Sequence, residues 1–260
     1  MSTDFAGDGP SPTAEWYRRA FGDLYLDVYS HRDPDEARGI VSWLADAASI
    51  EGARVCDLAC GAARFFQPIA DAGARAYVGV DYSMPLLRRA RASASASETF
   101  FALIRADMRA VPLRAASIDL LLSMFTSFGY FDDAGNRRVL GEAARLLRPG
   151  GRLVLDIVNP DWLERTLVPE SVREEAGGVV VREAREVRGH HVRKRVAISR
   201  DGTPLDTYIE SVRLFRRDEL DSWLGAVGLT RLAIWGDYAG GAFDPAGSPR
   251  LIALATKERS

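Results

Sequence analysis

Residues 53–83, ARVCDLACGAARFFQPIADAGARAYVGVDYS, decide the fold of this chain. The apolar run at residues 55–58 predicts a buried strand, and the small residues after it lead into a helix with apolar positions at helical spacing. A second apolar run, residues 76–80, follows the helix and ends at Asp81. A strand–helix–strand unit with a right-handed crossover binds its ligand at the carboxyl ends of its strands. We therefore expect a ligand site beside Asp57 and Asp81.

The turn after the first strand, residues 59–63, has almost no side chains, so a ligand can lie against its backbone. A nicotinamide dinucleotide site would carry three glycines there, whereas only Gly61 is present and Asp57 would put a negative charge near the pyrophosphate. A phosphate-binding loop would need the pattern G-x-x-x-x-G-K-[ST], and neither the lysine nor the spacing occurs. A ligand with a cationic head and a ribose agrees better with an acid at each strand end. S-adenosylmethionine is such a ligand.

The same stretch resembles motif I of the class I, Rossmann-like, S-adenosylmethionine-dependent methyltransferases, whose usual form is D-L-x-C-G-x-G. The resemblance is specific over residues 53–158, and it is strongest to bacterial enzymes that act on small molecules. Ala59 and Ala63 stand where the family often has glycine. Because alanine tolerates a positive φ poorly, we expect ordinary backbone dihedrals at both alanines, or else a reduced affinity for the cofactor.

A third acid, Asp107, follows the strand expected at residues 100–105, and acids at three successive strand ends are the strongest single argument in the sequence. The resemblance implies that Asp57 faces the amino group of the cofactor, Asp81 its ribose and Asp107 its adenine. It also implies an aromatic N-terminal lid that closes on the methionine end, with Arg32 pairing with the carboxylate. The cofactor-binding residues implied in this way are Tyr25, Tyr29, Arg32, Asp57, Ala59, Gly61, Asp81, Tyr82, Asp107, Met108 and Met124.

The order of the remaining patterns predicts an α/β fold, a Rossmann-like seven-stranded and mostly parallel sheet with helices on both faces. Alternation of period two over residues 179–215, with Asp201-Gly202 as a hairpin turn, predicts three antiparallel strands inserted after strand five. The resemblance implies that such an insertion covers the acceptor site. The expected divisions are a disordered N-terminus (1–12), a helical lid (13–48), the methyltransferase core (49–158 and 216–260) and the insertion (159–215).

Composition argues against several classes of partner. The net charge of −2 gives no general attraction to nucleic acid or to an anionic membrane, and the basic cluster at residues 188–195 lies on an alternating strand whose charges face solvent. No apolar run approaches the roughly 20 residues of a membrane span, and the first residues lack the layout of a signal peptide. Cys56 and Cys60 form neither a disulfide framework nor a zinc motif. We therefore expect a cytoplasmic protein that binds a small molecule and holds no metal. The inserted strands could also pair two copies of the chain into a homodimer.

Methyl transfer from a sulfonium is an in-line displacement, to which a protein contributes mainly position and the exclusion of water. A base is needed only if the acceptor is a weakly acidic hydroxyl or a protonated amine. Aromatic residues of the stretch FTSFGYF, residues 125–131, are expected around the sulfonium. The candidate bases are His31, Tyr130, His190, His191 and Asp237.

The function that we expect is transfer of a methyl group from S-adenosylmethionine to an N or O atom of a small molecule, which leaves S-adenosylhomocysteine. A protein that binds either compound without turnover is the alternative, and a nicotinamide-dependent oxidoreductase is a weaker one.

Overall fold

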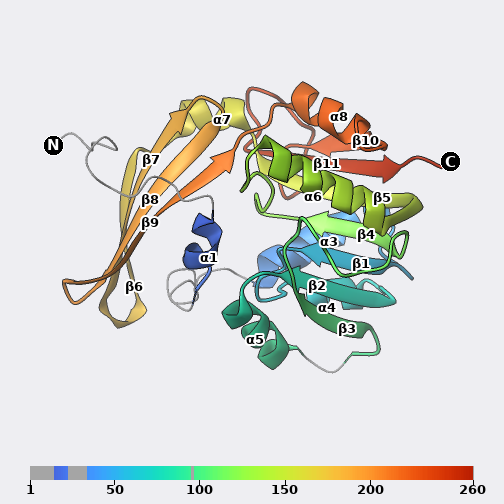
Figure 1. Cartoon of the computed structure of the whole chain (residues 1–260), viewed down its shortest axis with the longest axis horizontal. Helices are drawn as coiled ribbons and strands as arrows, with labels where there is room; N and C mark the ends of the chain where they lie inside the picture. Colours follow the sequence, from blue (N-terminus) through green and yellow to red (C-terminus); the bar gives the residue numbers. More distant parts are fainter. Residues whose placement is uncertain (1–14, 23–33, 95–96, 260) are drawn as a thin grey trace.

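The computed structural model describes residues 15–22, 34–94 and 97–259, and its centre is a seven-stranded sheet (Figure 1). The strand order is β10-β11-β5-β4-β1-β2-β3. Strands β1 to β5 pair in parallel, whereas β11 is antiparallel to both of its neighbours. The predicted mostly parallel, Rossmann-like sheet is confirmed. The strands are β1 (Arg54–Leu58), β2 (Ala76–Asp81), β3 (Phe100–Arg105), β4 (Ile118–Ser123), β5 (Leu147–Val158), β10 (Leu229–Trp235) and β11 (Arg250–Lys257).

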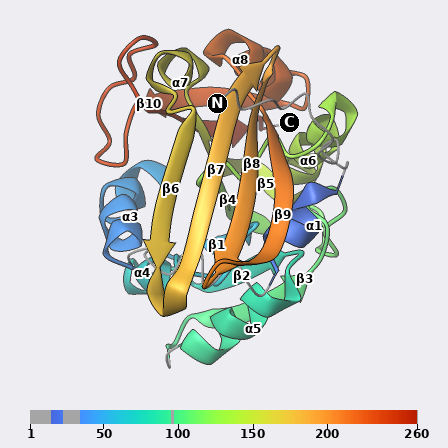
Figure 2. The ribbon, with the colours of Figure 1, turned by 90° about the vertical axis from the view of Figure 1, so that its left-hand side faces the viewer.

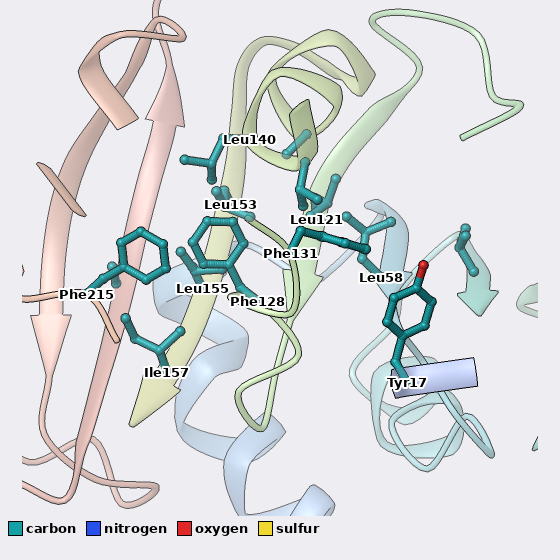
Figure 3. Packing of buried hydrophobic residues seen from close by; sticks show 14 of the residues in the cluster. Tyr17, Leu58, Leu121, Phe128, Phe131, Leu140, Leu153, Leu155, Ile157 and Phe215 are labelled. Atoms are coloured by element: carbon teal, nitrogen blue, oxygen red, sulfur yellow. The ribbon is translucent and has the colours of Figure 1, made fainter. Parts of the chain in front are cut away.

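Helices cover both faces of this sheet, as predicted, because neighbouring residues of each buried strand point to opposite faces. In β4, Leu121 packs with residues of α6 and α8, while Leu120 and Leu122 pack with residues of α3 and α4. Figure 3 shows part of the first of these two cores, with Leu121, Leu153 and Leu140 side by side. The helices of the sheet are α3 (Pro34–Ala48), α4 (Phe66–Asp71), α5 (Met84–Ser93), α6 (Asp133–Leu146) and α8 (Arg217–Gly225).

A separate antiparallel sheet follows the short helix α7 (Pro160–Thr166). Figure 2 shows its four strands side by side in the order β6-β7-β8-β9. The three strands predicted over residues 179–215 are present as β7, β8 and β9, whereas β6 was not predicted, because its sequence, ESVREE, contains Val172 as its only large apolar residue and so lacks an apolar alternation. The predicted turn at Asp201-Gly202 is present, with φ values of 49° and 79°. The strands are β6 (Glu170–Glu175), β7 (Val179–Arg188), β8 (His191–Arg200) and β9 (Thr203–Arg213), with the 3-10 turn η1 (Ala176–Gly178) between the first two.

The N-terminal helix is shorter than its apolar periodicity predicts. In the described residues, α1 (Trp16–Ala20) ends just before Phe21 and Gly22. The carbonyl of Phe21 accepts a hydrogen bond of 2.6 Å from the hydroxyl of Ser83. The helix lies between the two sheets (Figure 1), and Arg19 on it forms an ion pair with Asp206 of β9.

Candidate functional site

A cavity of about 610 Å³ opens where the parallel strands end. Asp57, Asp81 and Asp107, from the ends of β1, β2 and β3, all line it, and Tyr17 of α1 lines it as well. The topology therefore brings the acids of three strand ends to one place, as their spacing in the sequence indicates. The lining residues that belong to the predicted cofactor-binding set are Asp57, Ala59, Gly61, Asp81, Tyr82, Asp107, Met108 and Met124.

The turn after β1 keeps a left-handed backbone at both alanines. The φ angles are 58° at Ala59, 56° at Gly61 and 54° at Ala63, so the expectation of ordinary dihedrals at the alanines was wrong. Backbone hydrogen bonds hold this shape, because the amide of Cys60 donates to the carbonyl of Val80 (3.1 Å) and the amide of Ala63 donates to the carbonyl of Cys60 (2.9 Å). Each non-glycine residue in this region costs about 1–2 kcal/mol. The turn thus has the left-handed backbone conformation that glycine usually adopts, although alanine occupies two of its positions.

Asp57 is a buried carboxyl with a single donor among the described residues. Its side chain is 2% exposed, and the hydroxyl of Tyr77 donates to its Oδ2 over 2.6 Å. Burial raises the pKa of Asp57 to about 7, against the opposing effects of the Tyr77 hydrogen bond and the positive charge of Arg64. Its Oδ1 remains available to a ligand in the cavity.

Asp81 joins the turn after β1 to the turn after β2. Its Oδ2 accepts from the amide of Gly61 (2.8 Å) and its Oδ1 from the amide of Ser83 (2.7 Å). Burial raises the pKa of Asp81, and these two backbone hydrogen bonds oppose the rise. The Ser83 hydroxyl in turn accepts from the amide of Leu86 and caps α5.

Asp107 forms an ion pair with Arg109, a residue that the sequence analysis missed. The guanidinium bonds both carboxylate oxygens, at 2.6 Å from Nη2 and 3.0 Å from Nε. Burial would raise the pKa of Asp107, but the hydrogen bonds and charge of Arg109 outweigh it and hold the pKa below its usual range. Arg109 also lies 4.2 Å over the ring of Phe131 and bonds the hydroxyl of Tyr17 (3.5 Å). The spacing of the two residues, D-x-R after a strand, was the available signal.

Aromatic rings form one wall of the cavity, and only part of the predicted set is among them. Phe125, Tyr130 and Phe131 line the cavity, whereas Phe128 is 1% exposed and packs at 5.0 Å from Phe215 in the core (Figure 3). The ring of Tyr130 lies 4.8 Å from that of Trp16 on α1. Helix α1 therefore closes one side of the cavity.

The backbone behind Phe125 is fixed by a buried network that the sequence analysis did not find. Asp156 of β5 is 0% exposed, and its Oδ2 accepts from the amide of Phe125 (2.7 Å) and the hydroxyl of Tyr238 (2.9 Å). Its Oδ1 accepts from Nε of Arg250 (2.8 Å). Phe125 and Thr126 both have a positive φ, 56° and 60°. The loop of residues 236–249 thus supports this strained turn through Tyr238.

Most of the candidate bases lie away from the cavity. His190 is exposed in the turn between β7 and β8, His191 begins β8, and neither lines the cavity. Burial, together with the charge of Arg213, lowers the pKa of His191. Asp237 accepts hydrogen bonds from Ala239 and Gly241 of its own loop. Of the candidate bases within the described ranges, Tyr130 alone lines the cavity. The predicted residues outside the described ranges are Tyr25, Tyr29, His31 and Arg32.

Comparison with known proteins identifies the middle of the chain. Residues 55–151 match the family model of a methyltransferase domain. The curated demethylmenaquinone methyltransferase of Thermus thermophilus is 33% identical to this chain over 103 residues, which are 39% of this chain and 46% of that protein. The chain therefore matches less than half of the length of that relative.

Solved structures extend the likeness of the methyltransferase domain to the whole fold. The CcbJ methyltransferase of Streptomyces caelestis superposes with a TM-score of 0.77 at 21% identity, over 93% of this chain and 98% of that chain. CalS10, an amino pentose methyltransferase from Micromonospora echinaspora solved with S-adenosylmethionine bound, gives a TM-score of 0.65 at 21% identity, over 90% of this chain and 96% of that chain. The two sheets together thus have the same fold as these two solved structures.

Two further features were sought among the described residues of the chain. None of the helices in the described ranges has the length and apolar character needed to cross a membrane. Within the same ranges, no group of three or more His, Cys, Asp or Glu side chains is placed to hold a metal ion.

Proposed function

We propose that this chain is an S-adenosylmethionine-dependent methyltransferase that acts on an N or O atom of a small molecule. The observation that carries the proposal is the single cavity lined by Asp57, Asp81 and Asp107. The residues present fit an adenosyl ligand with an ammonium group. The turn at Ala59 and Gly61 offers backbone without bulky side chains, and Oδ1 of Asp57 is available to accept from an ammonium.

The residues divide along the cavity into separate binding tasks. Asp57 would take the amino group, Asp81 the ribose hydroxyls and Asp107 the adenine amine, while Tyr82 and Met108 would flank the base. When bound, the cofactor supplies a methyl group already activated by its attachment to a positively charged sulfur. Tyr130 and Phe131 would shield that region from water and favour a cation against their ring faces. Holding donor and acceptor in line is the main contribution of such a site to the rate.

The relatives support a small-molecule acceptor of more than one kind. CalS10 acts on an amino pentose, which favours a nitrogen acceptor, whereas the Thermus relative acts on demethylmenaquinone. Tyr130 is the candidate base beside the cavity for an acceptor that must lose a proton. The antiparallel strands β6 to β9 would cover the acceptor, and a pairing of two copies through them remains part of the proposal.

The proposal is tested in two steps with the full chain. Calorimetry first measures the Kd of S-adenosylmethionine and S-adenosylhomocysteine, with Asp107→Asn as the test variant and Asp71→Asn on α4, outside the cavity, as the control. We expect about tenfold weaker binding for the first variant and no change for the second. The second step measures release of S-adenosylhomocysteine from mixtures with amino sugars, other amines, phenols and quinols.

Each result leads to a different conclusion. Release with an amine or a hydroxyl compound supports the proposal, and a quinol product methylated on a ring carbon, with no release from the other compounds, would replace the N or O acceptor by a carbon one. Binding without release on every acceptor would favour a protein that holds the cofactor without turnover. Tight binding of NADH, with none of S-adenosylmethionine, would favour a nicotinamide-dependent oxidoreductase.

A further inference from the structure

The turn that follows β4 has a strained backbone and lies on the wall of the cavity. Phe125 and Thr126 both have a left-handed φ, a conformation that side chains disfavour. Of residues 124–127, all but Thr126 line the cavity. A glycine would adopt this conformation without strain but would place no ring on the wall. Other contacts of the folded chain must therefore hold the turn in its strained form.

A buried ion pair between β5 and β11 ties this turn at three points. The side chain of Asp156 accepts from the amide of Phe125 (2.7 Å), and its backbone carbonyl accepts from the amide of Thr126 (3.0 Å). Arg250, which is paired with Asp156, donates from Nη2 to the hydroxyl of Thr126 (2.8 Å). Because Asp156 is fully buried, its hydrogen bonds are stronger than they would be in water. The pair thus stabilises the conformation that the side chains of the turn disfavour.

Tyr238 supports both the backbone and the ring of Phe125. Its hydroxyl donates to Asp156 (2.9 Å), and its ring lies 5.2 Å from the ring of Phe125. The ring of Phe65 stacks on Phe125 with the centroids 5.5 Å apart. The ring of Phe125 therefore has a fixed place on the cavity wall.

The strand order places this turn at one end of the cavity. β4 lies on one side of β1, and β2 and β3 lie on the other. Neighbouring strands are about 4.8 Å apart, so the end of β4 is two strands, or about 10 Å, from the end of β2. In the proposed function, ribose and adenine lie beside Asp81 and Asp107, at the ends of β2 and β3. On that assignment the turn borders the part of the cofactor that carries the sulfur and the transferred methyl group.

We propose that Asp156 and Arg250 are positioning residues, which hold the turn of Phe125 and Thr126 and so shape the cavity at the sulfur end of the cofactor. The inference rests on the proposed function. Neither Asp156 nor Arg250 is among the described residues that line the cavity, so both act through the turn. A misplacement of about 1 Å can slow a reaction about a hundredfold, and a rigid wall beside the reacting sulfur prevents it.

The test removes the hydroxyl of Thr126, which cuts one tie of the turn and leaves both charges of the ion pair in place. Calorimetry measures the Kd of S-adenosylhomocysteine and of adenosine, which lacks the sulfur and the amino acid, for the full chain and for Thr126→Val. We expect Thr126→Val to bind S-adenosylhomocysteine about tenfold more weakly and adenosine with little change. Thr126→Ser keeps the hydroxyl and should bind both ligands as the unaltered chain does. Arg250→Lys keeps the charge beside Asp156 but loses the fork, and should act as Thr126→Val does.

The matched control is Thr256→Val on β11, the strand that also carries Arg250. The hydroxyl of Thr256 donates to the carbonyl of Gly151 (3.2 Å), outside the cavity. The control loses the same kind of hydrogen bond and should bind both ligands unchanged. Hydrogen exchange at the amides of Phe125 and Thr126 should be faster in Thr126→Val than in Thr256→Val or the unaltered chain, since the turn is looser there.

The outcomes separate this inference from the proposed function. If Thr126→Val weakens both ligands equally, or weakens neither, the ion pair does not position the sulfur end, although the cavity still binds the adenosyl group. Faster exchange at Phe125 with unchanged binding of S-adenosylhomocysteine would overturn the inference as well. If the unaltered chain binds neither ligand, the proposed function fails and this inference fails with it. Thermal unfolding checks that each variant is folded, and Arg250→Lys gives the same comparison where Thr126→Val does not fold.

Discussion

The hydroxyl of Tyr77 donates a hydrogen bond of 2.6 Å to Oδ2 of Asp57, and the two side chains are 0% and 2% exposed. The Tyr77 ring is held by Phe66 and Phe101, with centroids 5.5 Å and 5.9 Å away. A residue in the interior of the sheet thus fixes one oxygen of the carboxylate at the cavity and leaves the other to a ligand. This arrangement leads to the first two predictions.

Replacing Tyr77 by phenylalanine should move the pH dependence of ligand binding. The hydroxyl lowers the pKa of Asp57, so its removal should raise that pKa and leave less of the carboxyl ionised at neutral pH. We expect Tyr77→Phe to bind S-adenosylhomocysteine more weakly at pH 7 and to recover affinity as the pH rises toward 8. Calorimetry at several pH values measures this. The control is Phe101→Leu, which loosens the packing around the Tyr77 ring and should lower the free energy of unfolding without changing the pH dependence of binding. The same pH dependence in the unaltered chain, Tyr77→Phe and Phe101→Leu would refute the role of Tyr77.

The stability of the ligand-free chain should also depend on the titration of Asp57. Its pKa is about 7 in the folded chain and about 4 in an unfolded one, so the folded chain binds an additional proton between these values. The contribution of Asp57 to the free energy of unfolding is therefore fully present below about pH 4 and is lost as the pH rises through about 7. Urea unfolding at pH 5, 6, 7 and 8 should show that the chain loses stability relative to Asp57→Asn over this range. Parallel curves for the two proteins would contradict the prediction.

Glycine at the two alanine positions of the turn should have different effects. Ala59 is half-buried with φ 58°, so Ala59→Gly relieves about 1–2 kcal/mol of strain and loses about 0.4–1 kcal/mol to the greater freedom of the unfolded chain. We expect a gain of up to about 1 kcal/mol in the free energy of unfolding. Ala63 has φ 54° but is 7% exposed, and loss of its buried methyl group, worth about 0.8 kcal/mol, should cancel the gain. Urea unfolding of both variants measures the difference, and a loss of stability in Ala59→Gly would mean that the turn is not strained there.

Removing the charge of Asp156 should destabilise the wall behind Phe125. The substitution Asp156→Asn leaves Arg250, whose side chain is 17% exposed, without its ionic partner, and we expect a loss of about 3–5 kcal/mol in the free energy of unfolding. Tyr238→Phe removes one hydrogen bond to the same carboxylate and should cost about 1 kcal/mol. Chemical unfolding compares the two. Similar small losses for both would show that the Arg250 charge is solvated without Asp156.

The parts of the fold that sequence could predict are those with a local pattern. The apolar runs that became β1 and β2 and the acids at their ends are short-range signals, and the structure brings Asp57, Asp81 and Asp107 to one cavity. Strand β6 has no such pattern, because its charged side chains pair along an edge.

Contacts between distant parts of the chain could not be predicted in this way. The bond between Asp156 and Arg250 joins residues 94 positions apart, and nothing in either local sequence indicates it. The backbone at Ala59 could not be predicted either. Alanine disfavours a positive φ, but the hydrogen bonds of the folded turn hold Ala59 in that conformation.

Helix α1 is attached on both sides, since Tyr17 faces the cavity while Arg19 is paired with Asp206 of β9. Widening the entrance on that side requires the helix to be released from the antiparallel sheet. The ease with which compounds enter and depart is therefore set in part by the ion pair between α1 and β9, and two enzymes with identical cavities could differ in turnover through this contact alone.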